Sequence, residues 1–433
     1  MIASITKPHR VVCGQVFFWA QCAICSLGLF CALGLFDVGL AAASKPDPKR
    51  LEVGALPVLT GDSDIGFGFG AIGTFVRFDP HIKPYRWRLE VLWLMTVKAD
   101  PDGEGVDLPY HDDTVDLDLP GLFGGKVRLN LTLRFRRYTT SGYYGFGNDS
   151  SVDHRARDAN GRYHLYDRIY PSFDVQTRIK LGGPWRLLLG GRFIYNWVRV
   201  YEGSLLQTEL AAAESDDELA ALLHGVRDFP QLEANLGLIY DSRDHEYAPT
   251  RGFFHEASWR FSPGVAMGTD YAYGGANVTV RFYIPLAGEK LVLAARAMAD
   301  LIVGDPPFFE LARHGGLFPN DSLGGGKGIR GVPLQRYHGK VKLFSNLELR
   351  SKLFPFGFWG QRFNLGALAF FDVGRTWAEL GSSRFDGEGL GLKLGVGGGL
   401  RVQWGETFIV RGDVAWSPDA EPVAFYIDVS HIF

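Results

Sequence analysis

Cysteine is nearly absent from this chain of 433 residues, and the four that occur, Cys13, Cys22, Cys25 and Cys31, all lie near its start. A disulfide framework over the rest of the chain is therefore excluded. The rest of the chain also lacks any run of about 18 or more apolar residues, which excludes a transmembrane helix there. The formal net charge is -3, so no basic surface favours nucleic acid as a partner.

The cysteines fall in an N-terminal segment with the three parts of a secretory signal. Basic residues precede an apolar run over 11–36, and an alanine triplet ending at Ala43 supplies a cleavage site. We predict a signal peptide over 1–43 and a short periplasmic lead over 44–50. The alternative is an uncleaved membrane anchor, because the apolar run is long enough to span a bilayer.

Beyond the lead, apolar and polar residues alternate instead of gathering into long runs. Within 127–136, for example, every second residue is Val, Leu or Phe, and the residues between them are Arg, Asn and Thr. No soluble protein with two covered faces tolerates such a polar face, whereas a transmembrane β-barrel has lipid outside and a wet lumen inside. The pattern therefore predicts barrel strands.

Sixteen segments of this kind can be traced, eleven before and five after a glycine-rich stretch over 320–339. They cover residues 51–60, 66–78, 85–99, 114–119, 126–139, 164–181, 185–201, 230–241, 252–262, 271–286, 290–303, 340–354, 362–377, 389–404, 406–416 and 422–433. An even number suits a bacterial single-chain barrel. We predict an all-β fold over 51–433, a sixteen-stranded antiparallel transmembrane β-barrel in the bacterial outer membrane. Residues 205–226, rich in Ala, Leu and Glu, predict a short helix in one extracellular loop.

The glycine-rich stretch 320–339 is centred on Arg330. Strand alternation turns Glu348, Phe370 and Asp372 toward the lumen. A guanidinium can pair with two carboxylates and lie on an aromatic ring at once, so these residues are the expected partners of Arg330 if its loop folds inward.

The strand predicted over 389–404 leaves room for such a loop. Its inward face carries glycines where other strands carry side chains, which permits close approach of other backbone. These lumen glycines are Gly391, Gly395, Gly397 and Gly399. From the pattern alone, the alternative is a solvated outer loop, with glycines that only relieve the curvature of the barrel.

Several segments, in order, resemble the BamA/TamA-type outer-membrane assembly-factor superfamily, also called the bacterial surface antigen family. They are YYGFGND, LIYDSRDHEYAPTRG, GIRGVPLQRYHG, NLELR and FFDVGRTW. The resemblance extends from about residue 51 to 433. It implies that the loop enters the barrel and is fastened by a set that we call the loop latch, which comprises Arg330, Gly331, Glu348, Phe370 and Asp372.

The chain departs from the family pattern in two ways. Val332 stands where an aromatic residue usually follows the Arg-Gly pair, and the POTRA domains of the well-known members are absent from the sequence given. The resemblance is therefore to a barrel-only subgroup. It implies a role in inserting or translocating proteins or lipids at the outer membrane, through a weak seam between the first and last strands.

The partners implied are outer-membrane lipid and, as clients, nascent outer-membrane proteins or lipids. The alternative is a gated or plugged pore, or a structural barrel without clients. Neither a phosphate-binding loop that opens a helix nor a Gly-x-Ser-x-Gly elbow occurs. We therefore predict no enzyme activity, no catalytic residue, no cofactor and no metal site.

The end of the chain carries a pattern of its own. Phe425, Ile427, Val429 and Phe433 share one face of the last predicted strand, and the last residue is aromatic. This resembles the terminal signal by which outer-membrane barrels are recognised for insertion. We predict that the segment closes the barrel and that the protein is itself a client of the barrel-assembly machinery.

Overall fold

The structure is a computed structural model that describes residues 51–433 except 102, 104, 359–360, 405–407, 421–422 and 430. The predicted signal peptide and lead therefore lie outside the described residues. Among the residues described, no helix has the length and apolar character needed to cross a membrane.

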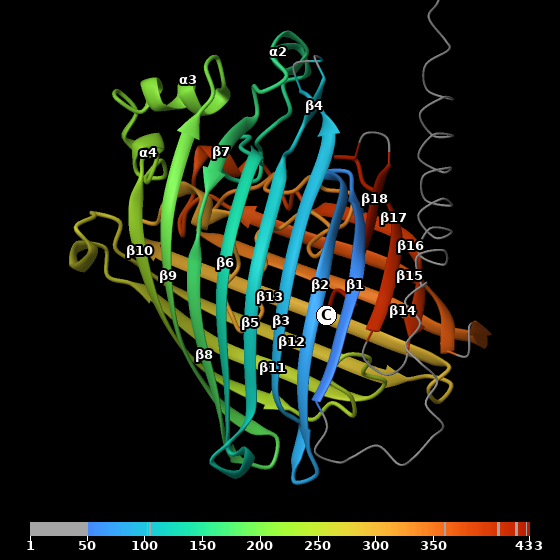
Figure 1. The fold of residues 1–433 in the computed structure, drawn as a ribbon. Coiled ribbons are helices and arrows are strands. Elements are labelled where there is room, and N and C mark those ends of the chain that lie inside the picture. The colour runs from blue at the N-terminus through green and yellow to red at the C-terminus, as the bar shows by residue number, and fades with distance from the viewer. Residues whose placement is uncertain are drawn as a thin grey trace, which may run out of the picture. The chain divides into compact units, whose positions relative to one another are not determined.

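The described residues form a closed antiparallel barrel (Figure 1). Its wall has sixteen strand positions, each of which we call a stave. The strands are β1 (Leu51–Asp62), β2 (Gly66–Asp79), β3 (Ile82–Ala99), β4 (Val106–Asp107), β5 (Tyr110–Leu122), β6 (Val127–Gly142), β7 (Leu165–Ile169), β8 (Ser172–Gly182), β9 (Trp185–Val200), β10 (Phe229–Asp241), β11 (Gly252–Ser262), β12 (Tyr273–Pro285), β13 (Leu291–Gly304), β14 (Val341–Phe358), β15 (Gln361–Trp377), β16 (Lys393–Trp404), β17 (Phe408–Trp416) and β18 (Ala424–Val429). Two staves are each built from two strands. Both β4 and β5 pair with β3, and both β7 and β8 pair with β6 and β9.

Alternation builds the wall as predicted. Along β14, Leu347 and Leu349 are exposed at 43% and 41%, whereas Asn346 and Glu348 between and beside them are fully buried. Apolar side chains thus face outward and polar ones face the lumen, which is the arrangement of a transmembrane barrel. The sixteen-stranded fold expected from the sequence is confirmed.

Strand bounds differ from the prediction where charged residues interrupt the apolar pattern. The strand predicted over 114–119 extends from Tyr110 to Leu122. Its start includes Asp112 because this carboxylate, like Asp118 further along, is paired with an arginine of β6. Arg136 Nε donates to Asp112 at 2.9 Å, and Arg128 Nη2 donates to Asp118 at 2.6 Å. The last strand, predicted over 422–433, ends at Val429.

The helices gather at one end of the barrel, here called the long-loop end; the opposite end, with the short connections, is the short-turn end (Figure 1). They are α2 (His154–Ala159), α3 (Leu205–Ala212) and α4 (Asp217–Ala220); one-turn 3₁₀ segments are η1 (Phe123–Gly125), η2 (Gly264–Met267), η3 (Phe308–Leu311) and η4 (Arg384–Asp386). The helix predicted over 205–226 is thus divided into two. Asp216 begins α4 by accepting a hydrogen bond from the Leu219 amide, and Asp favours a cap over a helix interior.

The barrel closes between its first and last strands, and this junction is weakly paired. In the described residues only Gly61↔Ile427 and Asp62↔Tyr426 are ladder pairs of β1 with β18. The other edge of β1 pairs with β2 along its full length, from Leu51 to Asp62. The paired part of the junction lies at the long-loop end, and the described residues toward the short-turn end form no ladder pair across the junction.

Candidate functional site

The connection between β13 and β14, residues 305–340, lies inside the barrel instead of outside it. Its apolar side chains pack on the inner wall in one buried cluster. The cluster comprises Leu323, Ile329, Val332 and Tyr337 from the loop, with Met298 of β13 and Phe344 of β14. The loop therefore has a small core of its own within the lumen.

Arg330 is the centre of this loop, and its side chain is fully buried. Its Nε and Nη2 donate to the two carboxylate oxygens of Asp372 on β15, at 2.8 and 2.9 Å. Its Nη1 donates to Glu348 Oε1 on β14 at 2.7 Å, and its backbone amide also donates to Asp372, at 3.1 Å. Buried charge pairs of this geometry are rigid, because both partners have been removed from water and need each other.

The two carboxylates are held by further polar groups of the wall. Asn346 Nδ2 donates to Asp372 Oδ1 at 2.8 Å, and Arg350 Nε donates to Glu348 Oε2 at 2.8 Å. Asp413 on β17 lies 3.6 Å from Arg330 Nη1 and also accepts from Arg411 Nη1 at 3.1 Å. Every charge near Arg330 thus has an opposite charge or a hydrogen-bond donor beside it.

An aromatic ring and a glycine complete the Arg330 pocket. The guanidinium carbon lies 3.5 Å from the ring centroid of Phe370, which satisfies a cation–π contact. On β16, a β-carbon added to Gly395 would lie 2.1 Å from the Arg330 carbonyl oxygen. A bare position is therefore required there for the loop backbone to reach the wall.

Gly331 connects the loop to the last strand. Its amide donates to the Tyr426 hydroxyl of β18 at 3.0 Å, and its φ of 95° is a left-handed conformation that glycine adopts without strain. A β-carbon there would also meet Ser417 Cβ at 2.8 Å. The structure therefore brings all five residues of the loop latch together, and adds Asn346, Asp413 and Tyr426.

The other predicted site residues are placed as follows. Gly397 and Gly399 lie on β16 with Gly395, and a β-carbon on either would collide with Phe370 or Asp413. Gly391 was predicted to lie on the lumen face of the same strand, and this is wrong. It precedes β16 in a left-handed turn with φ 49°, where its carbonyl accepts from Asn148 Nδ2 at 2.7 Å.

The last residues of the chain do not follow the outward face of β18. Phe425 is exposed at 43% and Ile427 and Val429 are half-buried, but Phe433 is buried inside the barrel. Its ring packs with Tyr283, Val292, Ala294 and Ile432. A polar contact also holds Phe433 inside the barrel, since Arg350 Nη2 donates to the Phe433 carbonyl at 3.1 Å.

Comparison with known proteins identifies the family. The model of the Omp85 superfamily domain matches residues 115–433. This chain belongs to the Omp85 superfamily. Among solved structures, this Omp85 chain is similar to BamA from Haemophilus ducreyi lacking POTRA domains 1–3, with TM-score 0.55 and 14% identity, over 88% of this chain and 70% of that one.

It is also similar to CdiB from Escherichia coli, with TM-score 0.53 and 13% identity, over 90% of this chain and 64% of that one. At these identities the likeness establishes the fold alone. A comparison of the sequence with curated proteins found no match.

In this Omp85 barrel the loop has further buried anchors that the sequence did not reveal. Asp300 of β13 accepts from the Gly315 amide of the loop at 2.8 Å and from both Nη atoms of Arg260 at 2.8 Å, and Lys342 lies 3.3 Å away. Glu256 of β11 accepts from the Leu317 amide at 2.7 Å.

A third anchor lies closer to the long-loop end. Arg313 of the loop pairs with Glu233 of β10, and its Nε donates to Glu310 of the loop at 2.7 Å. The loop of this Omp85 chain is thus fastened along its length, and Arg330 is its deepest ionic contact with β14 and β15.

The fit of the loop against β16 yields a direct prediction. Gly395→Ala places a β-carbon against the Arg330 carbonyl, so loop or wall must shift, and we expect a loss of about 1–3 kcal/mol of unfolding free energy. Urea unfolding of the barrel in detergent, followed by tryptophan fluorescence, measures it. Gly412→Ala on the neighbouring strand is the matched control, because nothing lies within 4 Å of its added β-carbon. Equal losses in both variants would contradict the close fit.

Proposed function

We propose that this Omp85 barrel inserts or translocates polypeptide or lipid at the bacterial outer membrane, and that the β1–β18 seam is the part that opens. One observation carries the proposal. The seam has two ladder pairs in the described residues, Gly61↔Ile427 and Asp62↔Tyr426, whereas β14 and β15 pair along nearly their whole length. The seam is therefore the weakest junction between described neighbouring staves.

The unpaired part of β1 has the chemistry of an acceptor for another strand. Along residues 51–60, backbone N–H and C=O groups on the seam side have no ladder partner among the described residues. Unpaired backbone groups cost several kcal/mol each in a bilayer, and a free edge pairs readily with an added strand. A nascent outer-membrane protein, which is itself made of strands, is the client that fits this edge.

The end of the chain keeps the edge free. If β18 continued straight, the register of the seam would bring Phe433 opposite Ala55. Instead the last residues turn into the lumen, where Arg296 Nη1 donates to the Ile432 carbonyl at 3.2 Å and Arg350 Nη2 to that of Phe433. The start of β18 is held at the same time by the Tyr426 contact with Gly331. The seam is thus fastened at one end and open at the other.

The orientation follows from the connections. In bacterial outer-membrane barrels the short turns face the periplasm and the long loops face outward. The open part of the seam then faces the side from which nascent outer-membrane proteins and lipids arrive. These are the clients that we propose.

A disulfide across the seam tests the proposal. In the double variant Gly61→Cys, Ile427→Cys the two β-carbons would lie about 3.9 Å apart, which is a suitable spacing for a disulfide. The native cysteines all lie within the first 31 residues, so no other thiol of the barrel competes. We expect the oxidised variant to lose insertion of a client barrel into proteoliposomes, and reduction to restore it.

The matched control is Thr74→Cys, Glu90→Cys, which joins β2 to β3 across a continuous ladder. This disulfide is expected to leave insertion unchanged. Insertion that persists with the seam locked would contradict the proposal. If the barrel inserts no client in either the reduced or the oxidised state and a steady ion current flows through it in planar bilayers, the barrel is a pore.

A further inference from the structure

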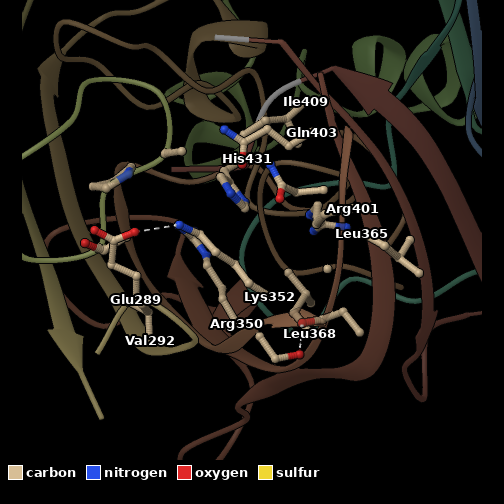
Figure 2. A pocket seen from close by; sticks show the side chains of 17 residues that line it. Glu289, Val292, Arg350, Lys352, Leu365, Leu368, Arg401, Gln403, Ile409 and His431 are labelled. Carbon is tan, nitrogen blue, oxygen red and sulfur yellow. Dashed lines mark hydrogen bonds and ion pairs between the residues drawn. The ribbon is translucent and has the colours of Figure 1, made fainter. Parts of the chain in front are cut away.

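A cavity of about 60 Å³ lies at the short-turn end of the lumen, away from Arg330 (Figure 2). The long polar side chains of its lining come from the β12–β13 turn, from β14, from β16 and from the end of the chain. They are Glu289, Arg350, Lys352, Arg401, Gln403 and His431; smaller polar residues and apolar residues, mostly of β15 and the β10–β11 turn, complete the lining. Figure 2 shows Arg401 and His431 on one side of the cavity and the Glu289–Lys352 pair on the other.

Three buried nitrogens among these side chains have no hydrogen-bond partner in the part of the chain that the structure describes. They are Arg350 Nη1, Arg401 Nε and His431 Nδ1. Arg350 and Arg401 are exposed at only 8% and 5%. Arg350 Nη1 and Arg401 Nε are donors, whereas His431 Nδ1 donates only when it carries the ring proton. A buried donor without an acceptor costs free energy, so the two arginine nitrogens beside one cavity indicate that an acceptor binds there.

The charges lining the cavity favour an anion. Arg350, Lys352 and Arg401 are cations, whereas the one carboxylate in the lining, Glu289, is paired with Lys352 at 3.2 Å. Both Nη atoms of Arg401 donate to Asp413, at 2.7 and 3.2 Å, and Arg350 Nε donates to Glu348. Each arginine thus has a carboxylate partner that does not line the cavity, and Arg350 Nη1 and Arg401 Nε remain unpartnered among the described residues.

We propose that this cavity binds a phosphate group. A cavity of this volume has room for several water molecules, and therefore for a small oxyanion. Guanidinium groups bind phosphate oxygens well, and a tetrahedral oxyanion offers acceptors to donors that converge from different sides. The group is either inorganic phosphate or the phosphate of a lipid headgroup whose remainder extends past the exposed Lys352.

Phosphate binding would affect several contacts near the short-turn end of the lumen. Arg350 holds both Glu348 of the loop latch and the Phe433 carbonyl, and Arg401 holds Asp413 beside Arg330. A phosphate on these arginines would add a partner to both without displacing any contact described above. The folded barrel should therefore gain stability when phosphate is present.

The test is thermal unfolding of the purified barrel with increasing sodium phosphate, against sodium chloride at equal ionic strength. We expect phosphate to raise Tm beyond chloride. Arg401→Gln should weaken the phosphate affinity by about ten- to a hundredfold, since it removes charged hydrogen bonds. His431→Gln and Lys352→Gln are milder variants that keep the arginines, and they should weaken the affinity by less if Arg401→Gln fails to fold.

Arg178→Gln is the matched control. Arg178 also has an unpartnered Nε among the described residues, but it does not line the cavity. Its variant should keep the full phosphate response. A response equal to that of chloride, or one lost equally in Arg178→Gln, would overturn the proposal.

The source of the phosphate is decided in nanodiscs. If phosphatidylglycerol in a phosphatidylcholine disc raises Tm and this gain is lost in the cavity variants, the site takes a lipid headgroup. If only added inorganic phosphate raises Tm, the site takes the free ion. If neither raises Tm, there is no phosphate site.

Discussion

Arg330→Ala is expected to cost the barrel about 3–5 kcal/mol of unfolding free energy, the usual range when one partner of a buried ion pair is removed. The variant leaves the Asp372 carboxylate buried without a guanidinium, leaves Glu348 with Arg350 alone, and removes the cation–π contact with Phe370. It also frees the loop segment that holds Tyr426 of β18. We therefore expect less folded barrel and, in what remains, a seam that opens more often.

Urea unfolding in detergent measures the stability, and the mobility of unheated samples in gel electrophoresis measures the folded fraction. Arg251→Ala is the control, because the Arg251 side chain is 76% exposed and its removal should change stability by no more than about 0.5 kcal/mol. Arg330→Lys should restore only part of the loss, since an ammonium cannot donate to Asp372 through two parallel bonds. A stability equal to that of Arg251→Ala would show that Arg330 fastens nothing.

Asp300→Ala is expected to have an effect of similar size, about 3–5 kcal/mol. Asp300 is the carboxylate that neutralises Arg260 and Lys342, and both cations are buried. Its loss also removes the acceptor of the Gly315 amide, which fixes the first half of the loop. The same urea titration measures it, and limited proteolysis tests whether residues 305–340 become accessible.

Asp305→Ala is the control for this second anchor, because the Asp305 side chain is 62% exposed. Asp300→Asn should lose less than Asp300→Ala, since an amide oxygen still accepts from Gly315 and Arg260. If Asp300→Ala were no less stable than Asp305→Ala, the loop would have to be held by Arg330 and its apolar contacts alone.

The architecture could be read from the sequence because each strand carries its own evidence. Period-two alternation depends only on the next few residues, so it identified all sixteen staves and turned Glu348, Phe370 and Asp372 inward. The start of β5 was missed because charge masks the alternation at Asp112. This residue belongs to the strand because Arg136 on the neighbouring β6 pairs with it.

The remaining contacts have no local pattern. Asp300 is one inward residue of β13 among several, and only the path of the loop determines that Gly315 comes to it. The same holds for Tyr426, whose hydroxyl meets Gly331 from 95 residues away. The inward turn of Phe433 depends on Arg296 and Arg350, whereas its sequence neighbours predict an outward face.

The central claim is that Arg330 and Asp372 together hold the loop inside the barrel, and a double-mutant cycle on Arg330→Ala and Asp372→Ala tests it most directly. Either single change leaves one member of the Arg330–Asp372 pair buried without the other, whereas the double change removes both members, so the double variant should be more stable than the sum predicts, by about 0.5–3 kcal/mol. Arg330→Ala combined with the exposed Arg251→Ala should be additive. Additive losses for Arg330 and Asp372 would contradict the account.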